Sequence, residues 1–215
     1  MGFKLPNGAT VEHAATYAEV LVVSAISNAA EAVADVTDAD LDVGDIVLIE
    51  SGWSALNSRV ARVKLATATA ITLEDIDTSD LQRFPAGSGG GALKKIETWV
   101  QIPQVTEVAF AGGEQQYADV VFLEDLQGRQ IPTDKSAASM TLTIADDPGK
   151  PFVKVLESAD TRKQVEAARM NLPGNDMLLW GVYTSFSKQP AVARNSVLTR
   201  TVNLALQGEP SRYLS

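Results

Sequence analysis

The sequence predicts a mainly β fold of the α+β class, a β-sandwich or barrel with one short helix, preceded by a small β-barrel-like module. Two stretches, 140–145 and 201–207, alternate apolar and polar residues, which is typical of strands with one buried face. One stretch, about residues 149–159, has the spacing of an amphipathic helix instead. A run of Pro, Gly and Ser at 85–91 divides the chain into two halves.

The first half contains short β-rich runs separated by turn residues. These runs are 45–51, 59–65 and 70–75. Their close spacing predicts a small antiparallel β-barrel or meander, and we assign residues 19–86 to this acidic module. Residues 1–18 are expected to form an N-terminal arm. The glycine and serine run at 87–91 is expected to be a flexible linker.

The second half, residues 92–215, is expected to be a separate β domain. Besides the two alternating stretches, residues 96–102 and 178–186 have the composition of strands. The helix is supported by apolar residues at i, i+3, i+4 and i+7, namely Phe152, Val155, Leu156 and Ala159. Pro151 is tolerated in its first turn, and Asp146 and Asp147 are candidate caps.

Composition excludes several classes of function. The 215 residues include no cysteine, so a disulfide framework, a thiolate metal site and a cysteine nucleophile are excluded, and a reducing compartment is expected. The net charge is −9, and nine acids against one lysine place most of it in residues 1–58. Neither half has the basic stripe that phosphate binding needs, and no apolar run is long enough to span a bilayer.

No catalytic, cofactor-binding or metal-binding constellation emerges. The acidic stretch 38–44 resembles a calcium loop, but Val43 occupies the position of the required glycine and Ile49 that of the glutamate, so we interpret it as an acidic turn. His13 is the only histidine, and we expect it to be structural or exposed. Each of the three tryptophans lies in or beside an apolar run, so we expect them to pack in the core and not to form a ligand platform; they are Trp53, Trp99 and Trp180.

A series of strings resembles the major tail tube protein of long-tailed (siphovirus-type) bacteriophages. In the second half these strings are residues 114–116, 122–125, 129–133, 135–137, 140–148, 171–174, 181–183 and 206–213. In the first half, residues 44–47, 51–53, 56–60 and 76–78 resemble an extra β module of some members. The resemblance covers nearly the whole chain.

The resemblance implies a structural virion protein without enzymatic activity or cofactor. Members of this family form stacked hexameric rings that make the tail tube, through which DNA is ejected into the host. It also implies assembly in the bacterial cytoplasm and contacts with the tape measure, tail terminator and tail tip proteins, with DNA passing through without specific binding and no membrane anchor.

Within this interpretation, one face of the last strand is a candidate for the wall of the lumen. Val202, Leu204 and Leu206 alternate with an uncharged polar face whose candidate lumen residues are Thr201, Asn203 and Gln207. Two alternatives stay open. One is a phage-associated adhesin or carbohydrate-binding β module, favoured by an exposed tryptophan on a concave face. The other is a hydrolase with a carboxylate pair in a buried cleft.

Overall fold

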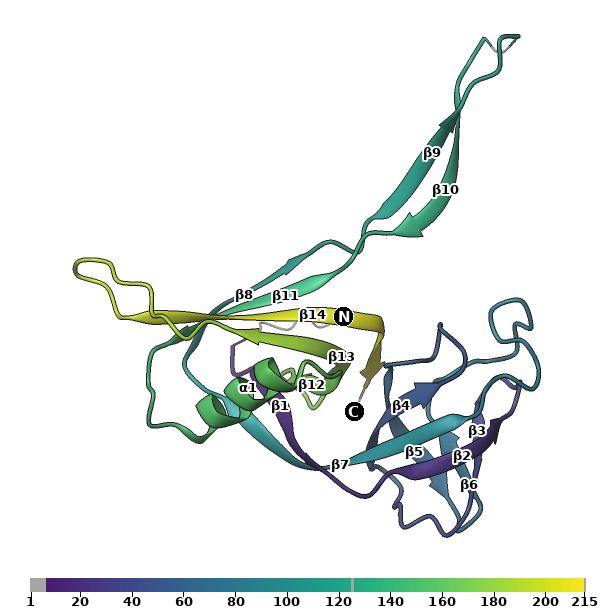
Figure 1. Cartoon of the computed structure of the whole chain (residues 1–215), viewed down its shortest axis with the longest axis horizontal. Helices are drawn as coiled ribbons and strands as arrows, with labels where there is room; N and C mark the ends of the chain where they lie inside the picture. Colours follow the sequence, from purple (N-terminus) through teal and green to yellow (C-terminus); the bar gives the residue numbers. More distant parts are fainter. Residues whose placement is uncertain (1–6, 125, 215) are drawn as a thin grey trace.

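The computed structural model of the chain describes residues 7–124 and 126–214, and this part is mostly β-strand with one helix (Figure 1). The elements in chain order are β1 (Thr10–Tyr17), β2 (Leu21–Ile26), β3 (Val33–Val36), β4 (Ile46–Ser51), β5 (Val60–Ala66), β6 (Ala70–Leu73), β7 (Gly91–Ile102), β8 (Val105–Ala111), β9 (Gln115–Val120), β10 (Arg129–Lys135), β11 (Ser139–Ala145), α1 (Pro151–Arg162), β12 (Glu166–Asn171), β13 (Met177–Phe186) and β14 (Thr199–Tyr213). The predicted mainly β class is confirmed.

The first half closes into a small barrel. Strands β2, β3, β6, β5 and β4 pair in that order, and the beginning of β7 pairs with both β4 and β2, which completes the ring. Its interior is apolar and includes Ile49, Trp53 and Leu73. The indole N–H of Trp53 donates to the carbonyl of Pro85 at 2.8 Å, so the one polar atom of this buried ring has a partner.

The second unit is a sheet with the order β7-β1-β12-β13-β14-β11-β8 and with α1 packed against one face. The helix buries Phe152, Val153, Leu156 and Ala159. It begins at Pro151 and continues three residues beyond the predicted end, to Arg162. Lys150 is the N-cap and no side chain caps the helix, so neither candidate aspartate has the predicted role. Lys163, at φ 52°, ends it with a left-handed turn.

The N-terminal residues differ from the expected arm. Residues 1–6 lie outside the described part, but β1 is a strand inside the larger sheet, between β7 and β12. Both faces of β1 are covered, because Val11 and His13 face the helix side and Ala14 faces the barrel. This strand therefore belongs to the core of the second unit.

The expected linker is a packed segment. Gly91 is the first residue of β7, and a Cβ atom there would approach the carbonyl oxygen of Glu50 to 2.1 Å. A Cβ atom on Gly89 would lie 2.7 Å from the ring of Trp53. The glycines thus allow backbone to approach closely, a role that the sequence run does not distinguish from flexibility. Since β1 and β7 are antiparallel neighbours, the barrel is an insertion between two paired strands.

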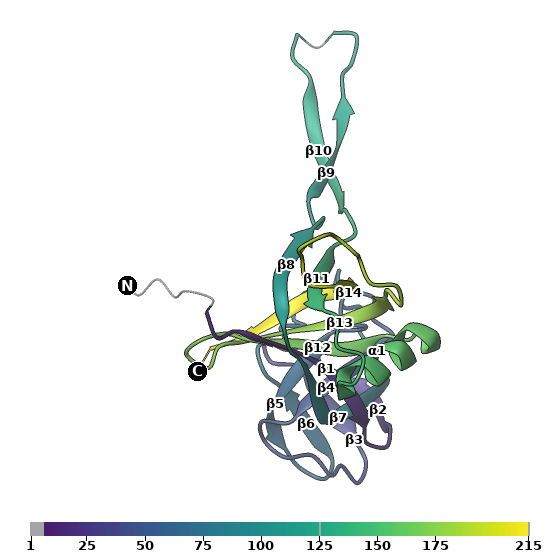
Figure 2. The ribbon, with the colours of Figure 1, turned by 90° about the vertical axis from the view of Figure 1, so that its left-hand side faces the viewer.

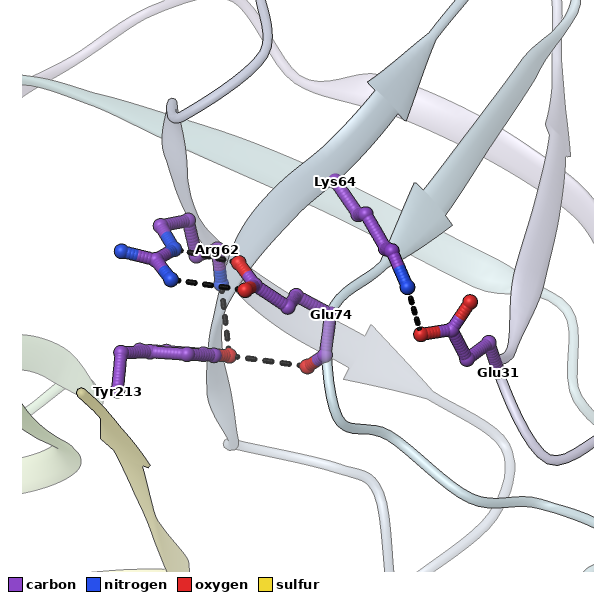
Figure 3. A network of polar contacts seen from close by, with 5 residues as sticks. All are labelled: Glu31, Arg62, Lys64, Glu74 and Tyr213. Atoms are coloured by element: carbon purple, nitrogen blue, oxygen red, sulfur yellow. Dashed lines mark hydrogen bonds and ion pairs between the residues drawn. The ribbon is translucent and has the colours of Figure 1, made fainter. Parts of the chain in front are cut away.

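The barrel and the sheet share a joint at the C-terminal end of β14 (Figure 3). The hydroxyl of Tyr213 accepts the backbone N–H of Arg62 at 2.9 Å and donates to the backbone carbonyl of Glu74 at 3.1 Å. The guanidinium of Arg62 pairs with the Glu74 carboxylate and lies 4.5 Å from the Tyr213 ring centroid. An ion pair between Lys64 and Glu31 lies beside this network on the barrel. Tyr213 is buried, so these bonds are shielded from water.

Candidate assembly surfaces

A long hairpin projects from the body of the molecule (Figures 1 and 2). Strands β8 and β11 pair within the large sheet, and the chain between them continues outward as the ribbon of β9 and β10. We call residues 112–138 the arm. At its base Gly112 and Gly113 adopt φ of 77° and 79°, and a Cβ atom on Gly112 would approach the carbonyl oxygen of Ala137 to 1.9 Å. The bend at the base of the arm therefore requires glycine.

The arm carries apolar side chains that nothing in the described chain covers. Tyr117 and Ile131 are exposed on the ribbon, and Leu123 and Leu126 near its tip have relative exposures of 105% and 106%. A two-stranded ribbon is marginally stable by itself in water. Exposed apolar surface of this extent on a soluble protein is characteristic of an interaction site.

The large sheet has two edges with unpaired backbone. Strand β8 pairs only with β11 among the described strands, so its other side is open. Strand β7 pairs with β1 along Ile96–Ile102, and its pairing with β4 on the other side ends at Lys95. Open edges are places where another chain adds a strand.

The three candidate lumen residues do not lie in equivalent surroundings. Asn203 is exposed, and its side-chain oxygen accepts the hydroxyl of Thr141 on β11 at 2.8 Å. Thr201 lies on the same face, beside Thr143. Gln207 pairs with Gly181, where a Cβ atom would lie 2.0 Å from the carbonyl oxygen of Ser58 in the barrel. Gln207 therefore lies where the barrel meets the sheet, whereas Asn203 is exposed and Thr201 is half-buried away from the barrel.

The opposite face of β14 is buried as predicted. Val202 and Leu204 are fully buried and Leu206 is half-buried against the same core. The exposed side continues onto the neighbouring strands as an uncharged polar strip of hydroxyl, amide and small side chains. This strip consists of Thr141, Thr143, Ser185, Thr201, Asn203 and Ala205. No lysine or arginine interrupts it.

The tryptophans do not form an exposed platform. Trp53 and Trp180 are buried. Trp99 is half-buried, and the guanidinium of Arg169 lies 4.4 Å from its ring centroid. Nothing in their placement favours a carbohydrate-binding surface.

His13 is buried and has a structural setting. Its Nε2 is 2.8 Å from the Thr184 hydroxyl, its Nδ1 is 2.8 Å from the Ala14 carbonyl, and Nδ1 is 3.7 Å from the Glu166 carboxylate. Burial lowers the pKa of His13 to about 4, so the ring is neutral near pH 7. Burial also raises the pKa of Glu166, although its ion pair with Arg162 at 2.7 Å opposes that shift. Sequence periodicity gave no signal for this cluster, because its members come from four elements.

The acidic stretch 38–44 forms a turn, as expected. The carboxylate of Asp45 accepts the backbone N–H of Asp42 at 2.8 Å, which closes the turn locally. Across residues 7–124 and 126–214, no three His, Asp or Glu side chains gather as metal ligands. In the same part of the chain, no helix is long and apolar enough to cross a membrane.

Comparisons with solved structures give distant likenesses. The sheath/tube terminator of an extracellular contractile injection system, PVC, is 13% identical, with 53% of this chain and 86% of that chain covered and a TM-score of 0.38. A chain of the anti-feeding prophage baseplate is 12% identical, with 55% of this chain and 86% of that chain covered and a TM-score of 0.40. The anti-feeding prophage tube terminating cap is 12% identical, with 54% of this chain and 83% of that chain covered and a TM-score of 0.36. No curated protein matches the chain.

The family comparison is decisive. The family described as "Phage tail tube protein, TTP" matches residues 51–215, which include the joint, the arm, the helix and all of the large sheet except β1. The match covers well over half of the chain. The chain therefore belongs to the phage tail tube protein family.

Proposed function

We propose that this chain polymerises as stacked hexameric rings into the phage tail tube, the conduit for DNA ejection into the host. In this role it is a structural protein of the virion tail, assembled in the bacterial cytoplasm, and it catalyses no reaction. Its partners are further copies of itself and other tail proteins, namely the tape measure, tail terminator and tail tip proteins. Family membership supports the coarse assignment to a structural tail component, and the surfaces described above support the finer one.

The observation that carries the proposal is the arm. It projects from the sheet with its apolar residues uncovered. In an isolated molecule this apolar surface stays in contact with water, whereas in an assembly a neighbouring subunit can bury it. Each fully buried Leu side chain contributes about 1.5–3 kcal/mol, so covering Leu123 and Leu126 on a neighbouring copy stabilises assembly by several kcal/mol per subunit.

The two open sheet edges support a ring. They belong to different strands, β8 and β7, so pairing between copies would be head-to-tail. Head-to-tail interfaces generate closed rings when the rotation between copies closes. Six copies that pair β8 of one with β7 of the next would leave no open edge in the ring.

The uncharged polar strip around Asn203 suits a surface past which DNA slides. Each lysine or arginine on such a wall would contact phosphate, and the repetition of rings would multiply that contact. We therefore assign Thr201 and Asn203, with their neighbours on β11, to the lumen. Gln207, beside the barrel, lies at the margin of this surface.

An arm deletion tests the proposal. Glu114 and Ser136 are hydrogen bonded across the base at 2.9 Å, so an Asn-Gly turn can replace residues 115–135 without disturbing β8 or β11. We expect this variant to keep the unfolding free energy of the body and to lose ring and tube formation, measured by sedimentation and electron microscopy.

A matched pair of point variants separates the arm from general surface effects. Leu123→Asp removes one exposed apolar side chain of the arm, and Leu81→Asp removes one from the barrel. Only the first should impair assembly. Arm-deleted protein that assembles as well as the full chain would contradict the proposal.

A further inference from the structure

The barrel carries an acidic groove. It lies between the beginning of β2, the end of β3 and β7, and it encloses about 590 Å³. Apolar side chains form part of its wall, and Val20 and Val22 at its rim are 47% and 71% exposed. The groove is thus partly apolar and open to solvent, and its size is within the range that binds a side chain or short peptide segment.

The groove also carries negative charge. Five carboxylates line the groove, from Glu19, Asp35, Asp38, Asp40 and Glu97. One ammonium group, that of Lys95, also lines it, which leaves a net charge of −4. Lys95 is already paired with Asp45 at 2.7 Å. None of the five carboxylates forms an ion pair with residues 7–124 or 126–214, so the groove keeps an excess of negative charge within the described chain.

The loop between β13 and β14, residues 187–198, has the opposite character. It carries Lys188 and Arg194 and no acid. Val192 and Val197 are 79% and 74% exposed beside these cations. Like the groove, the loop therefore combines charge with uncovered apolar surface, and its charge has the complementary sign.

Backbone hydrogen bonds define the base and the tip of the loop. The Ala191 N–H donates to the Thr199 carbonyl at 2.8 Å, and a turn at the tip is closed by the Ser196 N–H donating to the Ala193 carbonyl at 3.3 Å. Arg194 occupies this turn. These bonds reduce the number of conformations open to the loop, which lowers the entropic cost of binding.

Resting on the assembly proposed above, we propose that the 187–198 loop of one copy binds in the acidic groove of another copy's barrel. The contact places Arg194 among the groove carboxylates and Val192 against Val20 and Val22. It cannot form within one molecule, since the loop projects at one end of the large sheet and the barrel lies at the other (Figure 1). Such a head-to-tail contact gives the barrel a role in joining copies.

Charge distinguishes this loop from the other long projection. Residues 105–139, which include the arm, carry six acids and two bases, a net charge of −4. Placing the arm in the groove would bring like charges together, which costs binding free energy. The arm and the groove therefore have different partners in the assembly.

Cross-linking tests the contact directly, because the chain has no cysteine of its own. The full-length double variant Val22→Cys with Val192→Cys, assembled and treated with a short bis-maleimide, should give a ladder of covalent multimers. Each single variant should give no ladder, and a mixture of the two should give one cross-linked dimer. A control pair, Val22→Cys with Leu126→Cys, places the second thiol on the arm and should give none.

A charge exchange tests the same contact by another measurement. Arg194→Glu should raise the protein concentration needed for assembly by about tenfold, and Arg194→Lys should leave it nearly unchanged. Adding Asp38→Lys and Asp40→Lys to Arg194→Glu should restore assembly. Tubes that form without the ladder, or a ladder through the arm cysteine, would overturn this contact and leave the proposed tube intact. A chain that stays monomeric at every concentration would refute both.

Discussion

Two deletions of the barrel, one that also removes β1 and one that keeps it, test whether the barrel is a module inserted into the larger sheet or a domain that precedes it. A chain that begins at Ala92 lacks β1, whose Val11, His13 and Ala14 are buried in the large sheet. A second variant keeps β1 and replaces residues 19–94 with an Asn-Gly turn. Two residues are enough to join the cut ends, because the Ala18 N–H already donates to the Lys95 carbonyl at 3.0 Å.

The expected loss of stability follows from the cluster that the barrel covers. Excision uncovers three large residues, Ile96, Leu179 and Tyr213, together with two small ones, Ala14 and Ala167. One isoleucine, one leucine and one tyrosine at about 1.5–3 kcal/mol each give a loss of about 5–9 kcal/mol, to which the alanines add a smaller amount. This is a large share of the 5–15 kcal/mol typical of a folded domain, so the excised variant should fold with low stability.

Urea denaturation followed by near-UV circular dichroism measures both variants, since each retains Trp99 and Trp180. The excised variant should unfold cooperatively at a lower urea concentration than the full chain. The chain beginning at Ala92 should show no cooperative transition and rapid proteolysis. Equal, cooperative transitions for both would refute the assignment of β1 to the core.

Four further variants test the joint, the buried histidine, the base of the arm and the proposed lumen. Tyr213→Phe removes the hydroxyl that joins barrel and sheet and should lower the free energy of unfolding by about 1–3 kcal/mol, whereas Tyr183→Phe on the exposed surface should not. The pKa of His13 is about 4 when folded, against about 6.5 when unfolded, so the unfolded chain binds more protons between these values. Stability should therefore fall as the pH is lowered from 6.5 towards 4, and His13→Gln should remove this part of the pH dependence. Gly112→Val, which forces a Cβ atom against the Ala137 carbonyl, should impair tube assembly more than folding of the body, as judged by microscopy and circular dichroism. Asn203→Lys should leave tubes intact by microscopy but slow DNA ejection, with partial rescue at high salt, while Asn203→Gln changes neither; unchanged ejection would show that Asn203 is not on the DNA path.

The strands that could be predicted from sequence are those with one buried and one solvated face. Strand β11 is an example: Met140, Leu142 and Ile144 are buried and the threonines between them are half-buried. Strand β12 was missed for the opposite reason. Glu166, Ala167 and Ala168 are all buried, so alternation vanishes from its sequence.

The arm was missed because neither face of β9 or β10 is buried in one chain. Tyr117 and Ile131 are both exposed although they project from opposite faces of the ribbon. If another copy covers them, the burial pattern that defines these strands exists only in the assembly. The polar face of β14 was predictable from alternation, but which surface of a tube it lines depends on how copies are arranged. Closure of the barrel by β7 was likewise a long-range pairing without a local signal.

Cryo-electron microscopy of the assembled full-length protein shows directly whether its copies form a tube. We expect six-fold rings stacked into a hollow tube, with β8 of each subunit beside β7 of the next and the arm covered by a neighbouring copy. Thr201 and Asn203 should lie on the inner wall. A protein that remains monomeric in sedimentation at all concentrations and salt conditions, or rings in which the arm stays uncovered, would contradict the proposed assembly.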